Sequence, residues 1–242
     1  MPACLIIHGF TGGPYEVEPL ADYLAEYTDW HVEVPSLPGH GLGEDQRHLE
    51  LTSVSYQDWL DEAEGAYLEL QKEHDIIYLI GFSMGGMIAA YLAAKYSCER
   101  LVLLSTSRRY ISIPQMGLDM FRFAQKAVKR QLKDDQLFNH YRKKYGTVPA
   151  RSVREFLRCM KFTRPYLKEI KQPVLIVQGL QDGMVPYSAV HYLDKELPVE
   201  AEIIYFYDSK HLICLGEDKD VVIAAVFNFL TKKDISQKIR SV

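Results

Sequence analysis

The sequence predicts an α/β protein with a doubly wound, mostly parallel sheet, into which a helical segment is inserted. Short apolar runs alternate with helix-like segments along most of the 242 residues. Most of these runs are continuously apolar, which is typical of parallel strands that helices cover on both faces. Between residues 107 and 171 the alternation stops and the charge changes sign. These observations predict a core made of 1–106 and 172–242, interrupted by a helical basic cap at 107–171.

Six strand-like runs alternate with helix-like segments in a regular order. Strands are expected at 3–8, 31–34, 76–80, 101–105, 174–178 and 202–207. Helices are expected at 17–26, 56–72, 84–95, 189–197 and 219–230. Ser55 is the expected N-cap of the second helix, with Asp58 three residues further on. Such an alternation favours a parallel sheet with helices on both sides.

The segment 107–171 is basic and contains no clear buried strand. It holds 17 Lys and Arg residues against 5 Asp and Glu, whereas the rest of the chain holds 11 and 27. An apolar stripe at helical spacing runs from Met116 to Leu132, and short helices are expected at 152–161 and 166–170. We expect this cap to lie at the carboxyl ends of the strands, where such sheets bind ligands. Its charge indicates either docking on the acidic core or attraction of anionic lipid surfaces and acidic substrates.

Several other classes of protein are disfavoured by the composition. No apolar run approaches the roughly 18 residues of a membrane span, and the N-terminus has no secretory signal pattern. The four cysteines are scattered, without Cys-x-x-Cys or zinc spacing, and no His-Glu-x-x-His motif occurs. We therefore expect a cytoplasmic protein with reduced thiols and no metal site. Nothing resembles a nucleic-acid module, and membrane contact is not expected.

The pentapeptide Gly-Phe-Ser-Met-Gly at 81–85 is the strongest functional signal. It directly follows the apolar run 76–80 and opens the helix-like segment 84–95. A strand, a sharp turn and a helix in this order hold one serine up at the end of a sheet, and the glycines are needed because the turn is crowded. The pattern predicts Ser83 as a nucleophile.

A serine nucleophile needs a base, and the base needs a carboxylate that orients it. In sites that begin with such an elbow, the order along the chain is Ser, Asp or Glu, then His. His211 is the expected base because it follows the last strand. Asp182 is the expected acid because it lies in a glycine-flanked loop after the strand 174–178. Asp208 is the alternative acid, but it lies only three residues before His211.

The other histidines are expected to be structural. His191 is expected on a helix that faces away from the site, and His8 is expected to brace the loop after the first strand. Surface or linker positions are expected for His31, His48, His74 and His140. Asp218 and Asp220 are expected to begin the C-terminal helix, where negative charge complements the helix dipole.

An oxyanion that forms during acyl transfer needs two preorganised donors. The N–H of Met84 is one candidate, because it follows the nucleophile at a helix N-terminus. The N–H of Phe10 is the other, from the glycine-rich loop at 8–14. This loop lacks the Gly-x-Gly-x-x-Gly spacing and the Lys-Ser/Thr pair of phosphate-binding loops, which disfavours a phosphate site.

Together these motifs resemble the α/β-hydrolases, in particular the bacterial carboxylesterase and monoacylglycerol lipase branch. The resemblance rests on His-Gly-Phe-Thr-Gly at 8–12, the elbow at 81–86, Gly-Leu-Gln-Asp-Gly-Met-Val at 179–185, the histidine loop at 209–215 and Pro-Gly-His-Gly at 38–41. Lys210 stands where the family has Gly, and Gly-Glu-Asp at 216–218 replaces its usual early Asp. The resemblance spans 3–230. The chain starts at the strand before the oxyanion loop, so we expect the first two strands of the full fold to be absent.

The resemblance implies a serine hydrolase that cleaves carboxylic esters through an acyl-enzyme, without cofactor or metal. Ser83 would attack, His211 would relay the proton, Asp182 would hold the imidazole, and the Phe10 and Met84 amides would bind the oxyanion. The expected substrate-binding residues are Met116, Met120, Phe121 and Met184.

Short- or medium-chain acyl esters or monoacylglycerols are the expected substrates. Cleavage of peptide, thioester or carbon–carbon bonds by the same triad stays open, as do two other functions. One is a hydrolase-fold ligand receptor with little turnover, and the other is a lipase that acts at anionic membrane surfaces.

Overall fold

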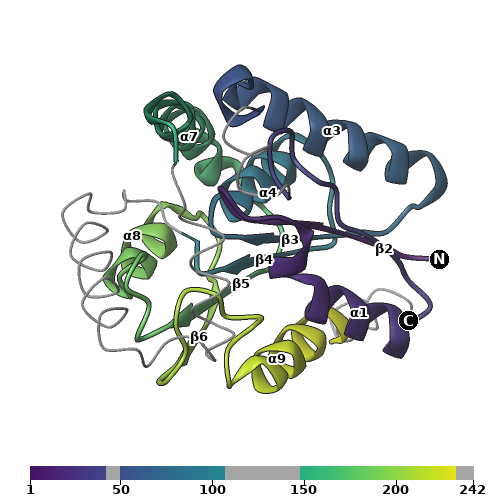
Figure 1. The fold of residues 1–242 in the computed structure, drawn as a ribbon. Helices are drawn as coiled ribbons and strands as arrows, with labels where there is room; N and C mark the ends of the chain where they lie inside the picture. Colours follow the sequence, from purple (N-terminus) through teal and green to yellow (C-terminus); the bar gives the residue numbers. More distant parts are fainter. Residues whose placement is uncertain (42–49, 107–147, 233–242) are drawn as a thin grey trace.

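The computed structural model describes residues 1–41, 50–106 and 148–232, and these form a parallel sheet between two layers of helices (Figure 1). The strands are β1 Ala3–Ile7, β2 His31–Glu33, β3 Ile77–Phe82, β4 Arg100–Leu104, β5 Val174–Gly179 and β6 Glu202–Phe206. They lie in the order β2-β1-β3-β4-β5-β6, and all neighbouring strands are parallel. The predicted strands are therefore confirmed, with ends that differ by one or two residues.

Helices cover both faces of this sheet. One face carries α1 Glu18–Tyr27 and α9 Lys219–Thr231; the other carries α3 Tyr56–Glu73, α4 Met84–Lys95, α7 Ala150–Thr163 and α8 Ser188–Glu196. Two 3₁₀ helices, η1 Pro14–Glu16 and η2 Arg164–Glu169, lie before α1 and after α7. Figure 1 shows α3, α4 and α7 on one side of the strands and α1 and α9 on the other.

The continuously apolar strands are explained by burial on both faces. In β1, Leu5 and Ile7 belong to the cluster under α4, whereas Cys4 and Ile6 belong to the cluster under α1 and α9. Successive side chains of a strand point to opposite faces of a sheet, so a strand covered on both sides is apolar at every position. The same division between the two clusters recurs in β3, β4 and β5.

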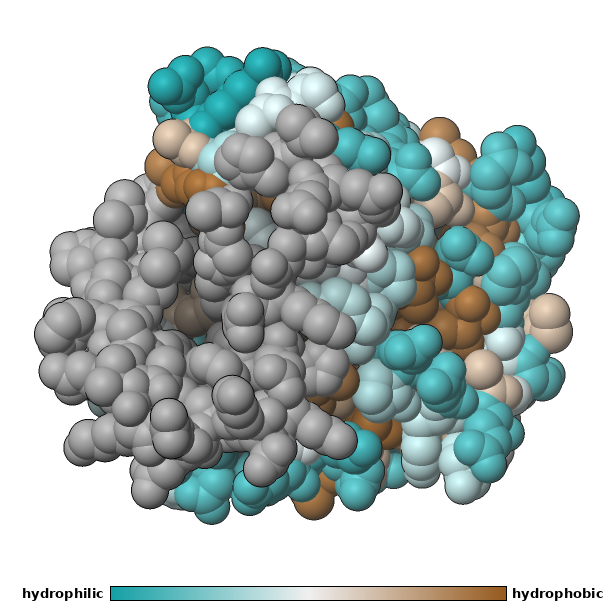
Figure 2. Space-filling model, in the orientation of Figure 1, coloured by the Kyte–Doolittle hydropathy of each residue, from teal (hydrophilic) through white to brown (hydrophobic). Residues whose placement is uncertain are grey.

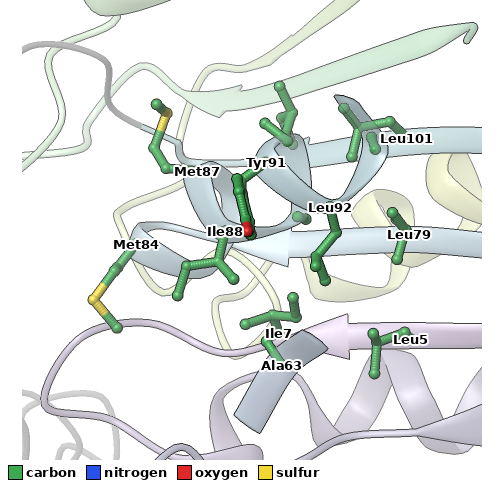
Figure 3. Packing of buried hydrophobic residues seen from close by; sticks show 14 of the residues in the cluster. Leu5, Ile7, Ala63, Leu79, Met84, Met87, Ile88, Tyr91, Leu92 and Leu101 are labelled. Carbon is green, nitrogen blue, oxygen red and sulfur yellow. The ribbon is translucent and has the colours of Figure 1, made fainter. Parts of the chain in front are cut away.

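Helix α4 is apolar on all sides because it is surrounded by protein. Every residue from Met84 to Ala93 is buried. Figure 3 shows Met84, Ile88 and Leu92 beside β1 and β3, with Ala63 close by. A helix without a polar face is stable only inside a core. The helix that follows the predicted nucleophile is therefore firmly held.

The described part of the predicted cap packs on this same helix. Helices α7 and η2 both contact α4, and α7 also contacts α3. Phe156, Cys159, Met160 and Leu167 join the cluster that includes α4 and the sheet. Residues 107–147 lie outside the described residues, so the division into a core and a separate cap stays a prediction.

The start of α3 confirms the predicted capping box. Ser55 donates its backbone N–H and its hydroxyl to the Asp58 carboxylate at 2.6 and 2.8 Å. The Ser55 N–H is the largest cause that lowers the pKa of Asp58 below its ordinary value. The box satisfies donors that the first turn of a helix leaves without intrahelical partners.

No helix in the described ranges is long and apolar enough to cross a membrane. Figure 2 shows that the described part of the visible face is mainly hydrophilic, with hydrophobic side chains gathered in small separate patches.

All four cysteines are free and buried, which leads to a first testable prediction. Burial raises the pKa of Cys98, Cys159 and Cys214 to about 12, and that of Cys4 further still. Since only the thiolate reacts, the native protein should show almost no reaction with an aromatic disulfide reagent at pH 8. All four thiols should react in denaturant. Rapid modification of any cysteine in the folded protein would contradict this prediction.

Candidate active site

The predicted site residues lie at the carboxyl edge of the sheet, where the winding direction changes. Strand β1 lies between β2 and β3, so the chain builds the sheet outward in both directions from β1. The loop after β1 leads to α1 on one face, and the loop after β3 leads to α4 on the other. Ligands of open α/β sheets bind at such a switch point.

Ser83 occupies the strained turn between β3 and α4. Its φ is 55° and its ψ is −116°, a left-handed conformation that is costly for a residue with a side chain. Its N–H donates to the Leu104 carbonyl at 2.9 Å, which ties the turn to β4. The Ser83 side chain is partly exposed at the end of the sheet.

The two elbow glycines are required by close backbone contacts. A Cβ at Gly81 would lie 2.2 Å from the Gly85 carbonyl oxygen, and a Cβ at Gly85 would lie 2.1 Å from the Ile7 oxygen. Gly85 thus allows the start of α4 to touch the end of β1. The same contact brings Ser83 close to the loop that begins at His8.

The structure joins Ser83, His211 and Asp182 in one chain of hydrogen bonds. His211 Nε2 lies 3.1 Å from Ser83 Oγ, and His211 Nδ1 lies 2.8 Å from Asp182 Oδ2. The His211 side chain is fully buried, as is that of Asp182. With Nδ1 protonated and donating to Asp182, Nε2 is free to accept the serine proton. This is the geometry that general-base activation of Ser83 requires.

The Asp182 carboxylate is held by both of its oxygens. Oδ1 accepts the N–H groups of Met184 and Val185 at 2.8 and 2.9 Å. Oδ2 accepts the Gln178 amide at 3.1 Å in addition to His211. An ionised carboxylate offers about four acceptor positions, so this one is fully used. Its orientation toward His211 is therefore fixed.

The acid loop and the histidine loop are packed against each other. A Cβ at Gly179 would lie 2.3 Å from the Ser209 carbonyl oxygen, and Gln181 N–H donates to that oxygen at 3.1 Å. Ser209 in turn donates to Asp218, the N-cap of α9, at 2.8 Å. The prediction that Asp218 begins the C-terminal helix is confirmed, and its side chain also anchors the histidine loop.

The loop after β1 is braced by a buried glutamate that the sequence did not indicate. Gly9 donates its N–H to Glu16 Oε2 at 3.0 Å, and Glu16 is only 1% exposed. A Cβ at Gly12 would lie 2.0 Å from the Glu16 carboxyl carbon, so this glycine makes room for the carboxylate. Thr11 takes a left-handed φ of 61°. The loop is thus held in one tight conformation.

Imidazole and aromatic rings also contact the loop after β1. His8 Nε2 accepts the Leu37 N–H at 3.1 Å, as expected for a bracing histidine. The Phe10 ring stacks on Phe156 of α7 with centroids 4.9 Å apart. His40, from the Pro-Gly-His-Gly segment, is buried and also contacts Phe10. Helix α7, which belongs to the segment predicted as the cap, therefore packs on the loop after β1.

Of the two candidate acids, the structure places only Asp182 against His211. Asp208 instead accepts a hydrogen bond from the side-chain amide of Gln181 on the surface, at 3.1 Å.

Of the predicted substrate-binding residues, Met184 lies partly buried two residues from Asp182. The other predicted substrate-binding residues, Met116, Met120 and Phe121, lie outside the described residues.

The expectation for His74 was wrong in one respect. His74 does lie in the link between α3 and β3, but it is not at the surface: it is 7% exposed, and its Nδ1 lies 2.8 Å from the Met1 carbonyl oxygen. Its Nε2 lies 3.2 Å from Nδ1 of His31. The chain N-terminus covers this ring, a contact across 73 residues that no local pattern predicts. His191 does lie exposed on α8, and His48 and His140 fall outside the described residues.

No group of three or more His, Cys, Asp or Glu side chains that could hold a metal occurs within 1–41, 50–106 and 148–232. Two surface cavities in this part, of about 720 and 680 Å³, are lined by none of Ser83, Asp182 and His211.

Comparison with known proteins identifies the family of the chain. The family model described as "alpha/beta hydrolase fold" matches residues 2–162. The thermostable monoacylglycerol lipase of Bacillus sp. (strain H-257) is 26% identical over 231 residues, which cover 94% of this chain and 90% of the relative. The carboxylesterase of Bacillus subtilis (strain 168) is 24% identical over 234 residues, which cover 96% and 93%.

Solved structures show the same fold. A structure from work on LipS and LipT, two metagenome-derived lipolytic enzymes, matches with a TM-score of 0.78 at 20% identity and covers 96% of this chain and 94% of that one. The monoacylglycerol lipase of Paleococcus ferrophilus matches with a TM-score of 0.70 at 18% identity and covers 94% and 93%. At these identities the likeness concerns the fold alone. Since the family model covers more than half of the chain, this protein belongs to the α/β hydrolase fold family, as a hydrolase of the carboxylesterase and lipase type.

Proposed function

We propose that this protein hydrolyses carboxylic esters of short or medium acyl chains, or monoacylglycerols, through an acyl-enzyme formed on Ser83. The observation that carries the proposal is the hydrogen-bond chain from Ser83 Oγ through His211 to Asp182. The names of the Bacillus relatives, a monoacylglycerol lipase and a carboxylesterase, support ester bonds as the target.

The reaction follows from the positions of these atoms. His211 Nε2 takes the Ser83 proton as the oxygen attacks the ester carbonyl, and Asp182 stabilises the imidazolium that forms. His211 then gives the proton to the leaving alcohol. A water molecule, activated by the same nitrogen, attacks the acyl-enzyme and releases the acid. The buried Asp182 carboxylate keeps His211 in the tautomer that both half-reactions need.

The oxyanion is proposed to bind the N–H groups of Phe10 and Met84. Met84 is the first residue of α4, and the N–H groups of a first helical turn have no intrahelical partner. In the loop after β1, the Gly9 N–H already donates to Glu16, and the Phe10 N–H is the next donor along the loop. The contact of Gly85 with the Ile7 and His8 carbonyls brings both segments together.

Substrate binding is proposed for Met184, which lies beside Asp182, and for Met116, Met120 and Phe121 of the predicted cap. These apolar side chains would form a roof of limited size, which favours short or medium acyl chains. A cytoplasmic location also stays our proposal, and the free, buried cysteines support it.

A panel of p-nitrophenyl esters of increasing chain length tests this function. We expect steady-state turnover with an optimum kcat/KM at short or medium acyl chains, together with covalent labelling by a fluorophosphonate. No turnover on any ester and no labelling would contradict the proposal. Labelling with negligible turnover would favour the receptor alternative. Activity that appears only with vesicles rich in anionic lipid would favour the membrane lipase.

A further inference from the structure

We propose that Gln178 is a positioning residue of the triad, which holds the Asp182 carboxylate against His211 through a buried amide donor. This inference rests on the proposed function, because it concerns how the same site is kept ready for proton transfer. Gln178 stands one residue before the end of β5, and its side chain is fully buried.

The position of Gln178 in the strand is one where an apolar side chain is expected. Val174 and Ile176, four and two residues earlier, belong to the hydrophobic cluster on the α4 side of the sheet. By the two-residue period of a strand, Gln178 points to this same face. A polar amide ends an otherwise apolar row, so packing alone does not account for it.

The hydrogen bonds of Gln178 account for the amide instead. Its Nε2 lies 3.1 Å from Asp182 Oδ2, 3.0 Å from the Val185 carbonyl oxygen and 3.1 Å from the Gly179 carbonyl oxygen. All three partners only accept hydrogen bonds. The opposite assignment of the amide would place Oε1 against three acceptors, so the neighbours determine which end faces them.

The other end of the amide has no such compensation. Gln178 Oε1 is buried, and no hydrogen-bond partner for it occurs within the described residues. Burying an acceptor without a partner is unfavourable. A methionine would fill a similar volume without this cost, so the donor end is the part of the side chain that the site uses.

The donor acts on the oxygen that orients the base. Asp182 Oδ2 accepts both Gln178 Nε2–H and His211 Nδ1–H. The amide hydrogen bond holds that oxygen in place and disperses part of its negative charge. The bond from Gln178 to the Val185 carbonyl also closes the acid loop from the inside. Without the amide, Oδ2 would move more freely and would attract the His211 imidazolium more strongly.

Two isosteric variants, Gln178→Met and Gln178→Glu, and one matched control test the proposal. Gln178→Met removes the donor, so kcat for a p-nitrophenyl ester should fall by about 10-fold to 100-fold while KM stays nearly constant. The acid limb of the kcat/KM profile should move to higher pH, because without the amide Asp182 Oδ2 attracts the imidazolium form of His211 more strongly. The control Gln181→Met removes an exposed amide from the loop that follows β5. This amide donates to Asp208 rather than to Asp182, so the control should change neither kcat nor the acid limb of the kcat/KM profile.

Gln178→Glu separates a positioning role from a merely structural one. A protonated Glu can still donate to Asp182 Oδ2, whereas an ionised Glu repels it. Its activity relative to wild type should therefore be highest at low pH and should fall as the pH rises. The methionine variant has no donor at any pH and should show no such recovery. Low-field proton NMR of the His211 Nδ1–H should show a shifted resonance in both variants but not in Gln181→Met.

Wild-type kcat, pH profile and His211 resonance in Gln178→Met would overturn the proposal. If that variant does not fold, Gln178→Glu decides the matter: a constant ratio to wild type across pH would overturn it equally. Failure of the proposed function is distinguishable, because then the wild-type protein itself would hydrolyse no ester. The NMR comparison needs no substrate and still reports on the contact.

Discussion

Replacing Ser83 by alanine is expected to reduce ester hydrolysis by about 10⁴-fold or more and to abolish fluorophosphonate labelling. The alanine has no hydroxyl to place 3.1 Å from His211 Nε2, so no acyl-enzyme can form. Residual activity would come only from the oxyanion donors and substrate binding. The measurement is kcat/KM for the preferred ester, with intact-mass detection of the labelled protein.

Ser53→Ala is the matched control for this variant. Ser53 is exposed, and its hydroxyl donates to the Glu50 carbonyl at 2.8 Å, away from the triad. This variant should keep wild-type turnover and labelling. If Ser83→Ala retained more than a few per cent of wild-type activity while Ser53→Ala behaved normally, another residue would have to be the nucleophile.

Replacing Gly85 by alanine is expected to destabilise the whole domain by about 3 kcal/mol or more. The added Cβ would lie 2.1 Å from the Ile7 carbonyl oxygen and 2.5 Å from that of His8, far inside normal contact distance. Both neighbours are backbone atoms that cannot rotate away. Helix α4 would have to move from β1, and α4 is buried throughout most of its length. Urea unfolding, followed by circular dichroism, measures the loss.

Gly65→Ala is the control, because it makes the same chemical change in helix α3. A Cβ at Gly65 would meet nothing within 4 Å. An alanine in a helix interior is favoured over glycine, so this variant should be equal to wild type or more stable by about 0.5–1 kcal/mol. If the Gly85→Ala protein had the unfolding midpoint of wild type, α4 and β1 would not be in the close backbone contact described above.

The elements of the sheet could be predicted because their signals are local. A run such as 174–177 is apolar at every position since helices cover both faces, and its short length distinguishes it from a helix. The elbow at 81–85 was recognisable for a similar reason: the strand, the glycines and the helix that create the strain are adjacent in the chain. Ser55 and Asp58 identified a helix start within four residues.

The residues that sequence reasoning missed depend on distant contacts. Glu16 resembles any glutamate at the start of a surface helix, and only the fold buries it under Gly9 and Gly12. His74 is covered by the chain N-terminus, 73 residues away. Gln178 left one signal, a polar residue that ends an apolar run. Its partner Asp182 lies in the following loop, and the positioning role that we propose for Gln178 depends on the contact between Asp182 and His211.

By itself, the sequence determined the order of the elements, the strained serine and the candidates for base and acid, because each depends on neighbours along the chain. It favoured Asp182 over Asp208 as the acid, from the position of each in the chain. Only the tertiary structure shows the contact that this choice requires: the packing of Gly179 on Ser209 places Asp182 Oδ2 2.8 Å from His211, while Asp208 turns to the surface. Loops from different strands meet only where the sheet brings their ends together, and a hydrogen bond across 29 residues has no local pattern to reveal it.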